Sequence, residues 1–278
     1  RRAARPNLPP VTLSPHPAPP QPPELPEGAR RRPRWPWWYA FAAFTVGFVL
    51  ANVLATPVVV VASDDGDLTP LGALLSTLIL DGVLVATAVG FAWTKERPRA
   101  WHFGLRRTPF WKGVGWTALI YLAYLLFVVA YGVLIGNPEE QTTPEDVGAD
   151  EGTFGLVNAG LLFVVIAPIG EEVFFRGFFY GALRSRLGMW SAALVGGVVF
   201  GSIHVFSGAE AVPVLAGLGV LLCVLYEKTG SLYPCIAFHV INNAIAYAVA
   251  ADAGAALAAA FALPMLAACV LAPRLQRP

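Results

Sequence analysis

The sequence predicts an all-α fold: a polytopic transmembrane helix bundle of about eight spans with both termini in the cytoplasm. Of the 278 residues, 56% are hydrophobic and only 13% are charged, with a mean hydropathy of +0.60. Soluble domains carry roughly a quarter charged residues. The apolar residues fall in blocks of about the 20 residues that a helix needs to cross a bilayer. The connectors between the blocks alternate in charge.

Eight apolar blocks follow one another along the chain. The predicted spans cover roughly residues 37–62, 71–93, 113–136, 154–183, 190–206, 212–227, 231–251 and 254–272. Acidic residues follow the first span, whereas the loop after the second is basic. This alternation continues, so that every connector rich in Lys or Arg falls on one side. The positive-inside rule assigns that side to the cytoplasm.

Residues 1–34 differ from the rest in composition. They hold eleven of the 24 prolines and few residues that could form a core, which predicts a disordered cytoplasmic tail. Residues 35–278 form the predicted transmembrane domain. Arginines up to Arg34, followed by an aromatic cluster that starts at Trp35, indicate a cytoplasmic entry into the membrane.

Charge and cysteine usage exclude several classes of partner. With a net charge of +1 and no basic face outside the membrane-flanking loops, we expect membrane lipid as a partner and no nucleic acid. The sequence favours no oligomeric state. Cys223, Cys235 and Cys269 lie in apolar blocks without CxxC spacing. They are predicted to be small core thiols rather than a disulfide framework or zinc cluster.

Three charged side chains lie together inside the fourth block. Charges at membrane depth are costly and therefore suggest a function. Glu172 and Arg176 are spaced i,i+4, so we predict a structural ion pair along one helix face. Glu171 lies about 100° round the helix and is predicted to be the working carboxylate. The alternative is a purely structural network of all three. Asp81, in the second span, is expected to pair with another helix.

Two later spans add polar groups at overlapping depths. His204 ends the fifth block, and His239 and Asn243 share a face of the seventh. A lone histidine in an apolar helix usually packs, but a second polar pair on another span makes coincidence less plausible. Pro168 and Gly170 are predicted to loosen the fourth helix and open space beside the carboxylates. The groups could therefore converge on one cavity.

Such a cluster has the minimum equipment for hydrolysing a carbonyl compound. An apolar surrounding makes a carboxylate a better proton acceptor, and a neighbouring histidine can polarise the same water. A His–Asn pair can donate hydrogen bonds to a developing oxyanion.

The ordered motifs resemble those of the CPBP family (CAAX protease and bacteriocin-processing, Abi), which is related to the Ras and a-factor converting enzyme. The family pattern EExxxR, FxxxH, HxxxN is matched by Glu171-Glu172-x-x-x-Arg176, Phe200-x-x-x-His204 and His239-x-x-x-Asn243. The resemblance covers roughly residues 155–250, within a motif-bearing core of about 154–251.

The resemblance implies an intramembrane CAAX-type endopeptidase of the cell membrane, acting on a peptide or lipidated-protein substrate. Glu171 and His204 would activate water, and His239 and Asn243 would stabilise the oxyanion. Members linked to immunity against peptide toxins suggest an alternative, a non-catalytic immunity or scaffold protein. A transporter is a further rival, but neither repeats nor a continuous polar path support it.

Metal dependence is a separate question. If zinc were bound, its ligands would be Glu171, His204 and His239, which match a catalytic ligand set. The sequence has no HExxH motif. The family resemblance favours a metal-independent glutamate protease, so we expect no cofactor and keep Zn²⁺ as the alternative.

Overall fold

The protein is a bundle of apolar helices. The computed structural model describes residues 35–64, 67–135, 147–205, 208–251 and 254–275. The predicted Pro-rich tail, 1–34, lies outside the described residues. Within them, the helices are α1 (Tyr39–Val61), α2 (Pro70–Trp93), α3 (Phe110–Ile135), α4 (Gly152–Gly160), α5 (Ala167–Glu171), α6 (Gly181–Leu183), α7 (Met189–Ser202), α8 (Ala211–Thr229), α9 (Leu232–Ala250) and α10 (Gly254–Leu275).

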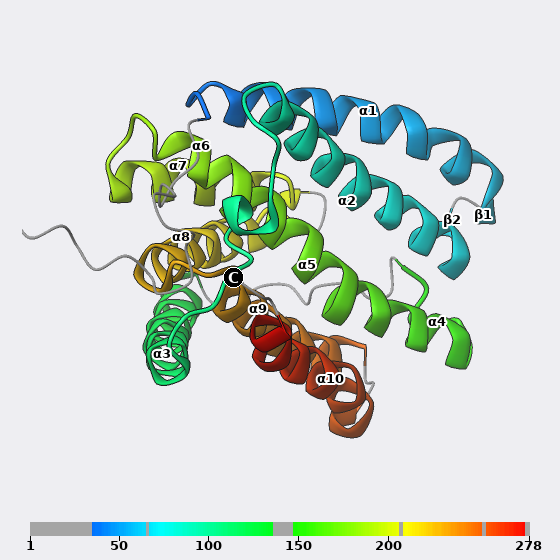
Figure 1. Cartoon of the computed structure of the whole chain (residues 1–278). Coiled ribbons are helices and arrows are strands. Elements are labelled where there is room, and N and C mark those ends of the chain that lie inside the picture. Colours follow the sequence, from blue (N-terminus) through cyan, green and yellow to red (C-terminus); the bar gives the residue numbers. More distant parts are fainter. Residues whose placement is uncertain (1–34, 65–66, 136–146, 206–207, 252–253, 276–278) are drawn as a thin grey trace, which may run out of the picture.

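Shorter elements complete the described chain. A 3₁₀ turn, η1, covers Ala100–Phe103, and two π-helical segments, η2 (Leu161–Ile166) and η3 (Glu172–Tyr180), lie between α4 and α6. Strands β1 (Ser63–Asp64) and β2 (Asp67–Leu68) pair antiparallel, with Ser63 opposite Leu68. This small hairpin joins α1 to α2, which pack against each other along their length (Figure 1).

The predicted helical fold is confirmed. Among the described residues, seven helical stretches are long and apolar enough to cross a membrane, and α7 is a shorter apolar helix. The chain is therefore a multi-pass membrane protein. The predicted fifth span, 190–206, corresponds to α7, which ends at Ser202 and has 14 residues. At 1.5 Å per residue it is about 21 Å long, against a hydrocarbon core of about 30 Å.

The central element is the continuous helical stretch Gly152–Leu183. Figure 1 shows it crossing the middle of the bundle, with α1 and α2 along one side and α9 and α10 along the other. Proline has no backbone N–H, so Pro168 cannot donate a helical hydrogen bond. Just before it, the N–H of Ala167 bonds to Leu162 O, five residues back. The predicted loosening near Pro168 thus takes the form of π-helical turns, which are common at functional sites.

Aromatic side chains of η3 contribute to the core of the bundle. Phe174, Phe175, Phe178 and Phe179 are at most 2% exposed. Trp35 is fully buried rather than placed in an interfacial belt, with its ring centroid 5.1 Å from that of Phe103 and 4.9 Å from that of Phe178. The two tryptophans that follow it, at 37 and 38, are exposed. The start of the described chain is therefore anchored against the central helix.

Glycines allow α7 and α8 to approach closely. A Cβ at Gly197 would lie 2.6 Å from Ala216 O, and one at Gly201 would lie 2.6 Å from Val212 O. Gly219 on α8 faces the α carbon of Gly197. Small residues at such crossings bring membrane helices into backbone contact. The contact fixes the end of α7, and His204 lies in the turn that follows it.

Replacing Gly197 by alanine should destabilise this crossing, because the added methyl group meets backbone atoms that cannot move independently. We expect the free energy of unfolding in detergent to fall by about 1–3 kcal/mol, the usual cost of overpacking. Gly132→Ala is the matched control, since a Cβ at Gly132 meets nothing within 4 Å. Equal thermal unfolding of the two variants would contradict this packing.

Candidate active site

A buried ion network links the central helix to α9. Arg176 Nη1 donates to Glu172 Oε1 at 2.7 Å, which confirms the ion pair expected from the i,i+4 spacing. His239 Nδ1 lies 2.9 Å from the same Glu172 oxygen. All three residues are at most 3% exposed. Because each charge is removed from water, each depends on the others for compensation.

The guanidinium of Arg176 is held from a second side by α7 and α8. It lies over the Phe200 ring, 4.4 Å from the centroid, and its Nη2 reaches Gly219 O at 3.5 Å. A cation above an aromatic face is stabilised by the negative face of the ring. The network therefore contacts the central helix, α7, α8 and α9 together.

Glu171 has a different environment from its neighbour. Its side chain is 14% exposed, whereas that of Glu172 is fully buried. Its Oε2 lies 3.8 Å from His239 Nε2 and has no hydrogen-bond partner among the described residues. That separation is too long for a hydrogen bond but close enough for electrostatic attraction to a charged imidazole. Glu171 thus lies next to the network, but its Oε2 makes no hydrogen bond to it.

His204 lies beside the Phe200 ring, which also lies near the ring of His239. Its Nδ1 lies 2.8 Å from Phe200 O. Since a carbonyl oxygen only accepts, Nδ1 carries the proton and Nε2 is left as the acceptor in the neutral ring. The Phe200 centroid lies 5.0 Å from the His204 ring and 6.1 Å from the His239 ring. His204 makes no hydrogen bond to Glu171 among the contacts of the described chain.

Asn243 lies one turn beyond His239. Its Nδ2 donates to Phe163 O at 2.9 Å, and its Oδ1 accepts from Asn242 Nδ2 at 3.4 Å. The carbonyl belongs to the π-helical segment η2, so this amide joins α9 to the central helix. One of the two amide hydrogens is used in this bond, and the second is available to another acceptor.

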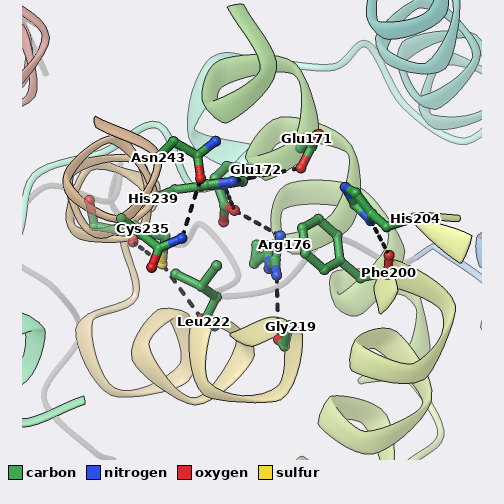
Figure 2. A network of polar contacts seen from close by, with 12 residues as sticks. Glu171, Glu172, Arg176, Phe200, His204, Gly219, Leu222, Cys235, His239 and Asn243 are labelled. Carbon is green, nitrogen blue, oxygen red and sulfur yellow. Dashed lines mark hydrogen bonds and ion pairs between the residues drawn. The ribbon is translucent and has the colours of Figure 1, made fainter. Parts of the chain in front are cut away.

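The predicted site residues therefore gather in one region, as Figure 2 shows, with Glu171, Glu172 and Arg176 on the central helix. His239 contacts the glutamates directly, while His204 and Asn243 make their bonds to backbone carbonyls. The sequence-based pairing of His239 with Asn243 did not anticipate that His239 bonds to Glu172. No local spacing carries that contact, because it joins residues 67 positions apart.

Asp81 is a carboxylate that sequence reasoning left without a function. A Cβ at Gly170 would lie 2.8 Å from Asp81 Cβ and 3.1 Å from its Oδ2, so Asp81 packs directly against the residue before Glu171. Asp81 Oδ2 is buried and has no hydrogen-bond partner among the described residues. Two sequence features could have indicated this contact: an acidic residue in an apolar span, and a glycine in the helix that carries the two glutamates.

The alternative zinc set was also compared with the geometry. Among the described residues, no group of three or more His, Cys, Asp or Glu side chains is arranged to hold a metal ion. The set Glu171, His204 and His239 does not fit a zinc centre in this arrangement. Metal independence stays a prediction. Cys223 and Cys235 are buried, as expected of core thiols.

The segment that carries most of this site matches a known family. The family described as type II CAAX prenyl endopeptidase Rce1-like matches residues 153–245. This segment, about a third of the chain, is similar to that family. It contains every polar residue of the site except Asp81, and the resemblance predicted from the three motifs is confirmed.

A curated relative agrees with the Rce1-like match. The "Putative membrane peptidase YdiL" of Bacillus subtilis (strain 168) is 28% identical over 79 residues, which is 28% of this chain. The alignment spans 32% of the relative's own length. No solved structure matches the chain. The two comparisons thus agree that part of the chain is similar to membrane peptidases, and the remaining helices are described by the structure alone.

Removing the guanidinium of Arg176 should strongly destabilise the fold, because the buried ion network depends on it. Arg176→Met should lower the free energy of unfolding by about 3–5 kcal/mol, because Glu172 would keep a buried charge without its main partner. Thermal unfolding in detergent measures the effect, with the exposed Arg186→Met as the control.

A double variant separates charge from packing. Glu172→Gln combined with Arg176→Met removes both charges and keeps an oxygen that accepts from His239. We expect it to recover much of the stability lost in the single variant. A double variant no more stable than Arg176→Met would contradict the ion-pair explanation.

Proposed function

We propose that the protein is an intramembrane endopeptidase of CAAX-protease type that hydrolyses a peptide bond of a membrane-associated substrate. The observation that carries the proposal is the position of His239, whose two ring nitrogens lie 2.9 Å from Glu172 and 3.8 Å from Glu171. If the network were purely structural, His239 would need only one carboxylate partner, and Glu172 already supplies it. The second carboxylate, Glu171, is partly exposed and lies outside hydrogen-bond distance of His239, so it is the one that can act on water.

In the proposed reaction, Glu171 takes a proton from water while the water oxygen bonds to the scissile carbonyl carbon. His204, with Nε2 as an acceptor, orients the same water. The carbonyl oxygen becomes an oxyanion in the tetrahedral intermediate. The C–N bond then breaks as the proton on Glu171 passes to the leaving nitrogen, which yields a carboxylic acid and an amine and returns Glu171 to its ionised form.

The oxyanion would be stabilised from α9. The free amide hydrogen of Asn243 is one donor, and His239 Nε2 is a second whenever the ring carries both protons. Glu172 supports this role because its bond to Nδ1 orients the imidazole. In this proposal Glu172 and Arg176 position His239 and do not touch the substrate.

A water-using site at membrane depth needs an opening to water. If α7 starts at one surface, its length of about 21 Å ends it inside a hydrocarbon core about 30 Å thick. Irregular backbone at such depth is tolerated where it lines a cavity. The turn after Ser202, which holds the half-buried His204, is the feature that supports such a cavity.

The substrate is proposed from the resemblance: a membrane-associated peptide or lipidated protein, with the CAAX tail as precedent, in the cell membrane. The name of the matched family, type II CAAX prenyl endopeptidase, supports this class. The relative's printed name says only that it is a membrane peptidase.

Cleavage by purified protein tests the proposal. Glu171→Ala should lower cleavage of quenched CAAX-type and library peptides by about 100-fold or more, since the general base is lost. Wild-type cleavage should persist in a metal chelator. The exposed Glu151→Gln is the control.

Other outcomes favour the alternatives. Wild-type activity lost in chelator would favour zinc. If the wild type cleaved no peptide in the library, or Glu171→Ala cleaved as well as the wild type, the non-catalytic immunity or scaffold function would take its place.

A further inference from the structure

A third carboxyl group lies beside the two glutamates. Asp81 comes from α2, outside residues 153–245 that match the family. Its side chain packs against the α carbon of Gly170, where any larger residue would displace it, and Gly170 directly precedes Glu171 in the central helix. A glycine is needed at position 170 because only glycine lets the aspartate approach.

Asp81 Oδ2 and Glu171 Oε2 are both buried without a hydrogen-bond partner among the described residues. Glu172 Oε2 is also without a partner, but the other oxygen of that carboxylate is bonded to Arg176 and His239. Ionised carboxylate oxygens can only accept hydrogen bonds, whereas a protonated carboxyl also donates. A single proton on one of the two groups would give both oxygens a partner.

The charges of the region also require a proton. Asp81, Glu171 and Glu172 supply three carboxyl groups, against two groups that can carry a positive charge, Arg176 and His239, which both contact Glu172. The other elements packed against α2 here, α1, α4 and η2, contain no charged residue, and η3 contributes Glu172 and Arg176. Two like charges held close in an apolar environment are costly, so one group keeps its proton.

We propose that Asp81 is a positioning residue of the active site, which shares one proton with Glu171 and thereby orients the carboxylate that acts on water. Asp81 donates the proton as a neutral carboxyl while Glu171 remains the acceptor of a water proton. The kinetic consequences of this inference rest on the proposed peptidase function. The shared proton itself does not.

The kinetic test uses two variants that differ in one property. Asn at position 81 is neutral and still donates a hydrogen bond, so Asp81→Asn should retain most of kcat. It has no proton to lose, so the alkaline limb of the kcat/KM pH profile should move upward or vanish. Asp81→Leu lacks a donor, and kcat should fall about tenfold or more because Glu171 is no longer oriented.

The control for both variants is Ser76→Ala, a buried polar position on the same helix. It should leave activity and pH profile unchanged. If Asp81→Asn gave the wild-type pH profile, or Asp81→Leu kept full activity, the proposal would be overturned.

An infrared measurement tests the shared proton without any substrate. The difference spectrum between wild type and Asp81→Asn, recorded near neutral pH, should show the carbonyl stretch of a protonated carboxyl group only in the wild type. Absence of this band from the wild type overturns the proposal even if peptides are cleaved. Its presence in a protein that cleaves nothing supports the shared proton while removing the peptidase function.

Discussion

The architecture of the site depends on one constraint: a glutamate and an arginine buried at membrane depth must be compensated by neighbours. Glu172 has no access to solvent, and a single oxygen of its carboxylate accepts from both Arg176 and His239. Arg176 in turn contacts Phe200 and the backbone of Gly219. These contacts require the central helix, α7, α8 and α9 to meet at one point. The bundle is therefore arranged around a charged group rather than around apolar packing alone.

This arrangement separates two adjacent carboxylates into different roles. Glu172 is fully buried and bonded to Arg176 and His239, whereas Glu171 is partly exposed and lies 3.8 Å from His239. The separation depends on local backbone, since the π-helical turns around Pro168 set where successive side chains point. It also depends on Gly170, which lets a carboxyl group of α2 approach. A residue outside the family match, Asp81, thus packs against the motif-bearing helix inside it.

Features set by local spacing could be predicted from the sequence. Apolar blocks predicted the helices, and the i,i+4 spacing predicted the Glu172–Arg176 pair. Contacts between distant helices could not be predicted, because spacing does not specify which faces meet. The bond from His239 to Glu172 and the approach of Asp81 to Gly170 are both of this kind. The burial of Trp35 is another, since an interfacial aromatic and a core aromatic look alike in sequence.

The central claim is that neighbouring glutamates divide structure and chemistry between them. Measuring both unfolding and peptide cleavage for Glu171→Gln and Glu172→Gln in the same detergent tests it most directly. The account predicts that Glu171→Gln unfolds like the wild type but cleaves nothing, while Glu172→Gln is less stable and keeps measurable cleavage when folded. Two variants with the same loss of stability and of cleavage would contradict it.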